Sequence, residues 1–154
     1  MLLQNIKTLF TGKRWQHNVD LEIQDGHISK ILPTSDHTSP SIDLVLPAFI
    51  DCHTHLIFAG SRAHEFELRS RGATYAEIMQ AGGGIQNTVK ATRNASEQEL
   101  IDLAMPRLEH MRQQNIACIE IKSGYGLSID SELKMLEVIA KLRRLNPSKS
   151  KPLS

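Results

Sequence analysis

The fold and the site of this chain are decided by residues 45–55, which read Val-Leu-Pro-Ala-Phe-Ile-Asp-Cys-His-Thr-His. An apolar run bounded by a proline predicts a buried strand. His53 and His55 are two residues apart, so their side chains should point to the same face of an extended chain. Two imidazoles on one face can hold one zinc or iron ion. A surface or core role is the alternative, but enzymes on parallel sheets place their sites at strand carboxyl ends.

Length and composition are those of an ordinary globular domain. The chain has 154 residues, 40% hydrophobic and 23% charged, enough for one domain with a core. The formal net charge of +1 indicates neither nucleic acid nor an anionic membrane as a partner. We expect no signal peptide, no membrane span and a cytoplasmic location.

The two cysteines, Cys52 and Cys118, lie in apolar segments that resemble strands. We therefore expect reduced thiols in the core of a cytosolic protein rather than a disulfide. Cys52 should face away from the two histidines, because successive strand residues alternate between faces. A role for Cys52 as a third metal ligand is therefore not expected.

Residues 1–45 are predicted to form a small β domain. Apolar and polar residues alternate over residues 19–24, as in a half-buried strand. Asp25-Gly26 then predicts a two-residue hairpin turn. The spacing of apolar residues over 28–31 indicates a bulge or twist in the return strand. Residues 33–40 are polar and turn-rich, which predicts a loop.

Residues 46–154 are predicted to alternate strands and helices. The capping boxes Thr74-x-x-Glu77 and Ser96-x-x-Glu99 each open a helix. A second buried strand is expected over 116–122, and a helix with one apolar face over 131–145. This order favours β/α units on a parallel sheet, with a flexible polar tail at 146–154.

Three charged residues allow either a site or a structural role. Glu120 and Lys122 share a face at the end of the second strand, where charges are costly without partners. They are either part of a site or a structural salt bridge. Arg62 has a planar fork suited to a carboxylate, and the alternative is a surface arginine paired with Glu65 or Glu67.

Residues 49–55 resemble the first barrel strand of the amidohydrolase superfamily. Further motifs are together similar to the imidazolonepropionase family within it, and the similarity covers nearly the whole chain. These motifs are FAGSR (58–62), HEFELR (64–69), GATY (72–75), GGGI (82–85), EIKSGYGL (120–127) and ELKML (132–136).

The resemblance implies an α/β fold in which a small β-rich domain, residues 1–45, precedes the start of a TIM-type (β/α) barrel, residues 46–154. It implies hydrolysis of the cyclic amide of 4-imidazolone-5-propanoate to N-formimidoyl-L-glutamate in histidine degradation, with one zinc or iron ion per active site. His53 and His55 match metal ligands of the family. Arg62 matches the arginine that holds the propionate, and Tyr125 a tyrosine that contacts the substrate.

The chain departs from the family in its length. A complete barrel takes about 200 residues or more, so the barrel is expected to be incomplete here. The family's later histidine and aspartate ligands, and its acid–base histidine and glutamate, have no counterpart in this sequence. We therefore expect no catalytic residue in this chain and an inactive isolated polypeptide. A homodimer is allowed for the full-length protein.

Two other functions are compatible with the same residues. The first is another amidohydrolase, such as a deaminase or a cyclic-ureide hydrolase, which Arg62 and the loop at 123–126 disfavour. The second is a non-catalytic β/α module that uses the same surface for binding or assembly. The missing ligands favour this second alternative for the chain as it stands.

Overall fold

The structure is a computed structural model that describes residues 1–35, 38 and 40–145. The tail predicted at 146–154 and part of the loop predicted at 33–40 lie outside these residues. The chain divides into two compact units, Met1–Ala48 and Phe49–Ser154. Each unit has a hydrophobic core of its own.

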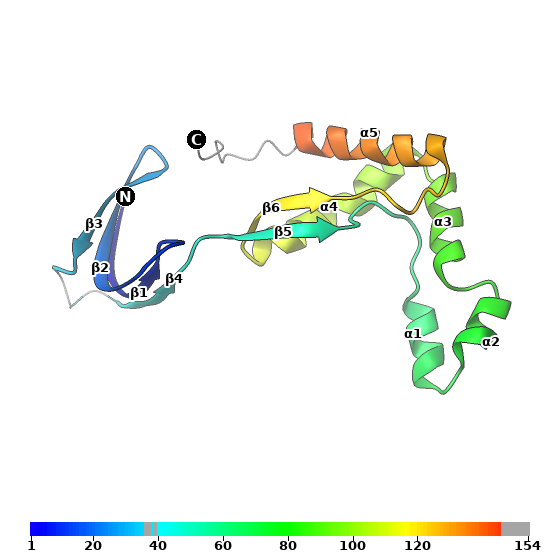
Figure 1. The fold of residues 1–154 in the computed structure, drawn as a ribbon, viewed down its shortest axis with the longest axis horizontal. Coiled ribbons are helices and arrows are strands. Elements are labelled where there is room, and N and C mark those ends of the chain that lie inside the picture. The colour runs from blue at the N-terminus through cyan, green and yellow to red at the C-terminus, as the bar shows by residue number, and fades with distance from the viewer. Residues whose placement is uncertain (36–37, 39, 146–154) are drawn as a thin grey trace. The chain divides into compact units, whose positions relative to one another are not determined.

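The described part of the first unit is a four-stranded sheet with the strand order β3-β2-β1-β4 (Figure 1). Its strands are β1 (Leu2–Phe10), β2 (Trp15–Gln24), β3 (His27–Pro33) and β4 (Ile42–Val45). Strand β2 pairs antiparallel with both neighbours, whereas β4 pairs parallel with β1. The core of this small sheet is formed by Ile6, Leu9, Val19 and Leu21.

The predicted hairpin of the first unit is confirmed. Asp25 and Gly26 connect β2 to β3, and both have positive φ angles, 50° and 77°, as a type I′ turn requires. The register between the strands shifts after the Glu22 pair, which is the bulge that the spacing predicted. Asp20 is buried, contrary to simple alternation, and its carboxylate accepts hydrogen bonds from the amides of Asn5 and Ser35.

The described part of the second unit, residues 49–145, contains two parallel strands and five helices (Figure 1). The strands are β5 (Phe49–Thr54) and β6 (Ile116–Ile121). The helices are α1 (Ala63–Ser70), α2 (Tyr75–Gln80), α3 (Ile85–Asn94), α4 (Glu97–Gln113) and α5 (Ile129–Leu145). The predicted parallel pairing is present, and the described strands form no closed barrel.

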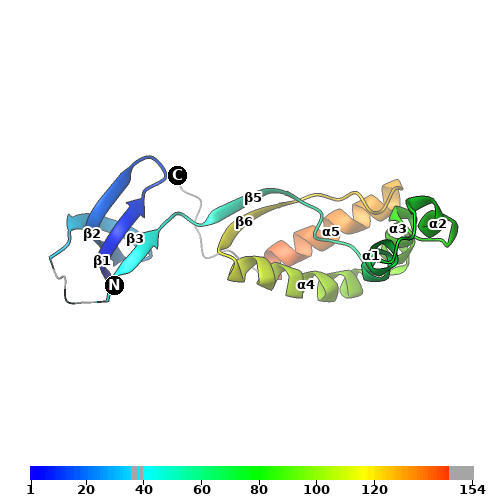
Figure 2. The same cartoon turned by 90° about the horizontal axis from the view of Figure 1, so that it is seen from below.

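The core of the second unit lies between the loop after β5 and the two long helices. Its buried residues are Leu56, Ile57, Ala59, Leu100, Ile101, Ala104, Met135, Val138 and Leu142. Helix α4 packs against both α5 and β6, as Figure 2 shows. Helices α1, α2 and α3 lie beyond the carboxyl ends of the two strands (Figure 1). Both predicted capping boxes are formed, at the N-termini of α2 and α4.

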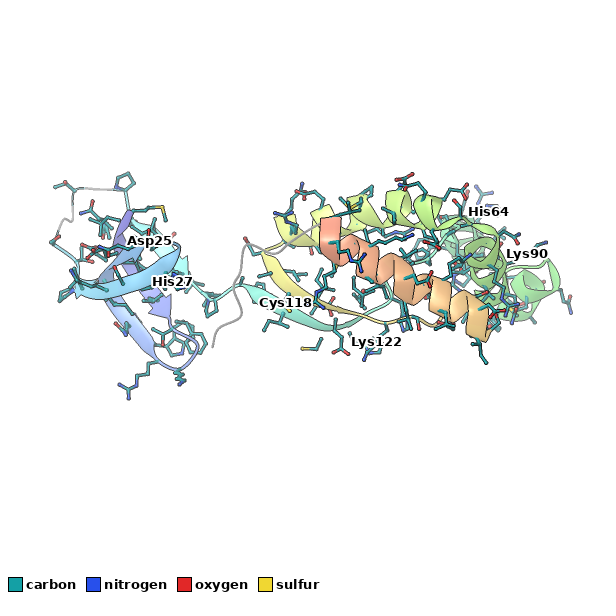
Figure 3. All side chains as sticks on the ribbon, turned by 90° about the horizontal axis from the view of Figure 1, so that it is seen from above. Asp25, His27, His64, Lys90, Cys118 and Lys122 are labelled. Atoms are coloured by element: carbon teal, nitrogen blue, oxygen red, sulfur yellow. The ribbon has the colours of Figure 1, made fainter. Side chains whose placement is uncertain are left out.

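The prediction that β5 and β6 are buried is wrong. Phe49 and Ile50 are 56% and 66% exposed, and the side chains of Cys52 and Cys118 are exposed free thiols rather than core residues. Figure 3 labels Cys118 on β6. A two-stranded sheet with helices packed on it leaves much of its surface uncovered, whereas an apolar run in a larger parallel sheet is covered on both faces. Leu145, predicted on the apolar face of α5, is also exposed, at 62%.

Two helices were not predicted. Helix α1 begins after Arg62 without a side-chain cap, so it lacks the sequence signal by which α2 and α4 were found. Helix α3 begins after Gly84, again without a side-chain cap, and its sequence is rich in polar and β-branched residues, which are weak helix formers. Its buried residues Thr88, Val89 and Thr92 show that packing decides its conformation. Among the helices of the described part, none has the length and apolar character needed to cross a membrane.

Helix α4 allows a matched test of this core. Leu100 is completely buried and Leu103, on the same helix, is 41% exposed. We expect Leu100→Ala to lower the free energy of unfolding by about 2–5 kcal/mol, since it leaves a cavity between α4 and α5. Leu103→Ala should cost about 1 kcal/mol or less. Urea unfolding followed by circular dichroism measures both, and equal losses would contradict this core.

Candidate functional site

The two histidines of the quoted segment converge. His53 is near the end of β5 and His55 follows it directly. Their Nε2 atoms are 3.3 Å apart, and the ring centroids are 5.2 Å apart with an edge-to-face geometry. The Oδ1 atom of Asp51 accepts a hydrogen bond from the amide of His53. This bond stabilises the C-terminal end of β5. The prediction that both imidazoles point to one side is confirmed.

The distance between the two Nε2 atoms fits a shared metal ion. Two nitrogen ligands at about 2.0–2.1 Å from a tetrahedral zinc lie roughly 3.3 Å apart. The two imidazoles therefore present donors at the separation that one ion requires. The Nδ1 atom of His55 is buried and has no hydrogen-bond partner in the described part of the chain.

The described residues provide no third ligand. No group of three or more His, Cys, Asp or Glu side chains among them could hold a metal ion. Cys52 is an exposed free thiol. His64 lies on α1, where its Nδ1 atom is 3.7 Å from Oε2 of Glu67. Figure 3 shows His64 well separated from Lys122, the residue that follows β6.

Glu120 and Lys122 form an ion pair on the surface. Lys122 Nζ donates to Glu120 Oε1, and both side chains are about half exposed. The hydrogen bond and the charge of Lys122 lower the pKa of Glu120, and the charge of His53 adds to this. The structural salt bridge, one of the two alternatives, is thus formed, and Glu120 lies close enough to His53 to interact electrostatically with it.

A cavity of about 380 Å³ lies among the loop after β5, helices α3 and α4 and the loop after β6. Its lining residues are Phe58, Gly60, Ser61, Arg62, Thr88, Arg107 and Tyr125. Arg62 and Tyr125, the two substrate-binding residues that the resemblance implied, therefore line one cavity. The alternative partners of Arg62 are engaged elsewhere: Glu67 pairs with Arg71, and Glu65 accepts a hydrogen bond from the amide of Gly84.

Tyr125 connects the cavity to the histidines. Its ring centroid is 5.5 Å from that of His55 and 5.7 Å from that of Phe58, both at edge-to-face angles. Tyr125 thus both lines the cavity and contacts the imidazole of His55.

The loop that carries Tyr125 is held by charged side chains from two helices. The Oε1 atom of Glu132 on α5 accepts hydrogen bonds from the amides of Gly126 and Leu127, at 2.8 and 2.7 Å. Arg93 of α3 donates to the carbonyl oxygens of the same two residues, at 2.5 and 2.9 Å. The N–H and C=O groups of both residues therefore have hydrogen-bond partners.

The charge of Glu132 is favoured by this loop. Burial raises the pKa of its carboxyl, but hydrogen bonds from Ser123 and from the loop amides lower it more, so the net shift is downward. An ionised carboxylate is the form that accepts from several amides at once. Lys134, two residues after Glu132 on α5, donates to the carbonyl oxygens of Thr92, Arg93 and Ala95. These hydrogen bonds stabilise the C-terminal end of α3.

The sequence is similar to several curated proteins. No family model matches the chain. The imidazolonepropionase of Aeromonas hydrophila subsp. hydrophila is 48% identical over 139 residues, which cover 85% of this chain and 34% of the relative. That of Aliivibrio fischeri is 52% identical over 124 residues, covering 77% and 30%. That of Yersinia enterocolitica is 56% identical over 107 residues, covering 70% and 26%.

This chain matches the N-terminal portion of imidazolonepropionases. It spans about a third or less of the length of these curated relatives. The resemblance drawn from the motifs is thereby confirmed.

The resemblance assigned no site role to Arg107, to Arg93 or to Phe58 of the FAGSR motif, whereas the structure places Arg107 and Phe58 in the cavity lining and Arg93 on the Tyr125 loop. Arg107 was detectable in principle, since it lies three residues after the buried Ala104, next to the apolar face of its helix. A charged residue at such a position needs a partner. Neither Arg93 nor Phe58 has a comparable local signal, because their partners are distant in the chain. Arg93 donates to Gly126 and Leu127, and Phe58 contacts Arg107 of α4 and Tyr125.

Gly124 sets the approach of the Tyr125 loop to His55. Its φ is +145°, and an added Cβ would lie 2.8 Å from Cε1 of His55. Gly72 has a similar restriction, with φ +97°, but an added Cβ there would meet nothing within 4 Å. We expect Gly124→Ala and Gly72→Ala each to cost about 1–3 kcal/mol of stability through backbone strain.

Only Gly124→Ala should also move the ring of His55. The measurement is the NMR signal of the His55 ring protons in both variants, with urea unfolding for stability. A His55 signal that changes equally in the Gly72→Ala variant, or in neither variant, would contradict the close contact of Gly124 with this imidazole.

Proposed function

We propose that this chain is the N-terminal portion of an enzyme that hydrolyses the cyclic amide of 4-imidazolone-5-propanoate to N-formimidoyl-L-glutamate. The observation that carries the proposal is the position of Tyr125, which contacts His55 and lines the same cavity as Arg62. A group that binds the substrate is thereby adjacent to a pair of metal-ligand side chains. Such an enzyme acts in the cytoplasm, and its full-length form can be a homodimer.

His53 and His55 would hold one zinc or iron ion through their Nε2 atoms. Their separation of 3.3 Å suits this role, and catalytic zinc takes three protein ligands and keeps one open position. The remaining ligands would come from residues outside this chain. Such an ion would supply a hydroxide nucleophile near neutral pH for the hydrolysis.

Arg62 and Tyr125 would orient the substrate for this attack. The guanidinium of Arg62 can bind the propionate carboxylate with two parallel hydrogen bonds. The hydroxyl of Tyr125 can donate a hydrogen bond to the imidazolone ring. Fixing both ends of a small ligand converts the reaction into a nearly unimolecular one, which is worth several kcal/mol of the barrier.

The cavity favours this substrate over those of the alternative enzymes. Two of its seven lining residues are arginines, and neither Asp nor Glu is among the seven. A substrate with a carboxylate side chain matches that charge, whereas aminopurines and simple cyclic ureides carry none. The alternative of a non-catalytic module is favoured by the two-ligand set of the described residues and is tested by metal binding.

The metal proposal predicts that the chain itself binds zinc through two histidines. We expect His53→Ala or His55→Ala to weaken Zn²⁺ binding roughly tenfold or more, about 1.4 kcal/mol. His17→Ala is the matched control, since His17 is exposed in the first unit. Isothermal titration calorimetry and elemental analysis measure the binding. A wild-type chain without bound zinc, or an equal effect of His17→Ala, would favour the non-catalytic module.

The catalytic proposal is tested in a chimaera. This chain would replace the matching N-terminal segment of the Aeromonas hydrophila imidazolonepropionase, which is 48% identical to it. We expect the chimaera to turn over 4-imidazolone-5-propanoate and the isolated chain to be inactive. Arg62→Gln should raise KM for this substrate at least tenfold, since a charged hydrogen bond is lost, and His55→Ala should abolish turnover.

Circular dichroism and zinc content establish that the chimaera and its variants are folded. Turnover of an aminopurine or a cyclic ureide, without turnover of the imidazolone, would reject the proposal in favour of another amidohydrolase. A folded, metal-loaded chimaera without any hydrolase activity would reject a catalytic role for this portion of the chain.

A further inference from the structure

Arg107 is a half-buried arginine in the wall of the cavity that Arg62 also lines. It comes from α4, and its Nη1 atom donates to the carbonyl oxygens of Leu56 and Phe58, at 3.0 and 2.8 Å. Its guanidinium carbon lies 3.6 Å above the centroid of the Phe58 ring, a cation–π contact. These three contacts fix the guanidinium in the cavity wall.

The charge of Arg107 has no acidic partner in the cavity. Besides the two arginines, the lining residues are Phe58, Gly60, Ser61, Thr88 and Tyr125, none of which carries a negative charge. Burial is what lowers the pKa of Arg107, so water has been partly removed from this cation. Both partners of its Nη1 atom are neutral carbonyl oxygens.

Two guanidinium groups in one concave, partly dehydrated site attract an anion. Arginine carries five N–H donors, and the hydrogen bonds described for Arg107 use only its Nη1 atom. Hydroxyl groups of Ser61, Thr88 and Tyr125 in the same lining can donate to further oxygen atoms. The chemistry of this wall is therefore that of a carboxylate site.

We propose that Arg107 provides a second positive charge for the carboxylate that occupies this cavity, together with Arg62. The inference rests on the proposed function only for the identity of that carboxylate as the propionate of the substrate. Arg107 is thus a determinant of specificity for an anionic side chain. The competing role is purely structural: Arg107 would do no more than fasten the segment from Leu56 to Phe58 to α4.

The two roles differ in their dependence on salt. A second charge strengthens anion binding most at low ionic strength, since salt screens it, whereas a structural fastener leaves the salt dependence to Arg62 alone. The probe is sodium propionate, with neutral propionamide as its uncharged counterpart. Binding to the 154-residue chain is measured by NMR titration of the amide signals of residues 58–62 and 125, at about 20 and 200 mM NaCl.

Four variants separate the contributions. We expect Arg107→Gln to weaken propionate binding several-fold at low salt and to reduce its salt dependence. Arg107→Lys should keep most of that salt dependence, because it keeps the charge. Arg112→Gln, on the same helix and exposed, where Arg112 lies 3.9 Å from Glu109, should change neither. Arg62→Gln should leave weak binding that still falls with salt, because Arg107 remains.

The outcomes distinguish this inference from the proposed function. A wild-type chain that binds propionate no better than propionamide, or that is unaffected by Arg62→Gln, would contradict the carboxylate role of the cavity and both proposals with it. Loss of binding in Arg62→Gln alone, with Arg107→Gln like the wild type, would overturn only the role of Arg107. Should Arg107→Gln fail to fold, the Arg62→Gln variant decides: salt-independent residual binding would assign Arg107 the structural role.

Discussion

The site of the second unit depends on the parallel pairing of β5 with β6. Parallel strands have their carboxyl ends at the same edge, so the segments that follow them emerge side by side. Residues 55–62 and residues 122–128, which are separated by more than 50 positions in the chain, meet there for this reason. The contact of the His55 ring with Tyr125 and Gly124 exists only because of this pairing.

The two segments would not keep a fixed geometry by themselves, since neither contains regular secondary structure. The helices around them supply the missing hydrogen-bond partners. Glu132 accepts from the N–H groups of Gly126 and Leu127, and Arg93 donates to their C=O groups. Arg107 donates to two carbonyl oxygens of the other segment. Unpaired buried peptide groups cost free energy, so each of these side chains stabilises its segment in one conformation.

Charge divides the site into two parts. At the end of β5 the Nε2 atoms of His53 and His55 are 3.3 Å apart, a separation that suits one metal ion. In the cavity the charges are guanidinium groups without acidic neighbours in the lining, a setting for an anion. Tyr125 belongs to both parts, since it contacts the His55 ring and lines the cavity.

The sequence by itself determined the elements whose signals are local: the hairpin at Asp25 and Gly26, the capped helices α2 and α4, and the convergence of His53 and His55. It also carried the motifs by which imidazolonepropionases are recognised. The tertiary structure decided the exposure of β5 and β6, the existence of α1 and α3, and the places of Arg107 and Arg93. These depend on which surfaces are covered and on partners distant in the chain, which no local pattern of residues encodes.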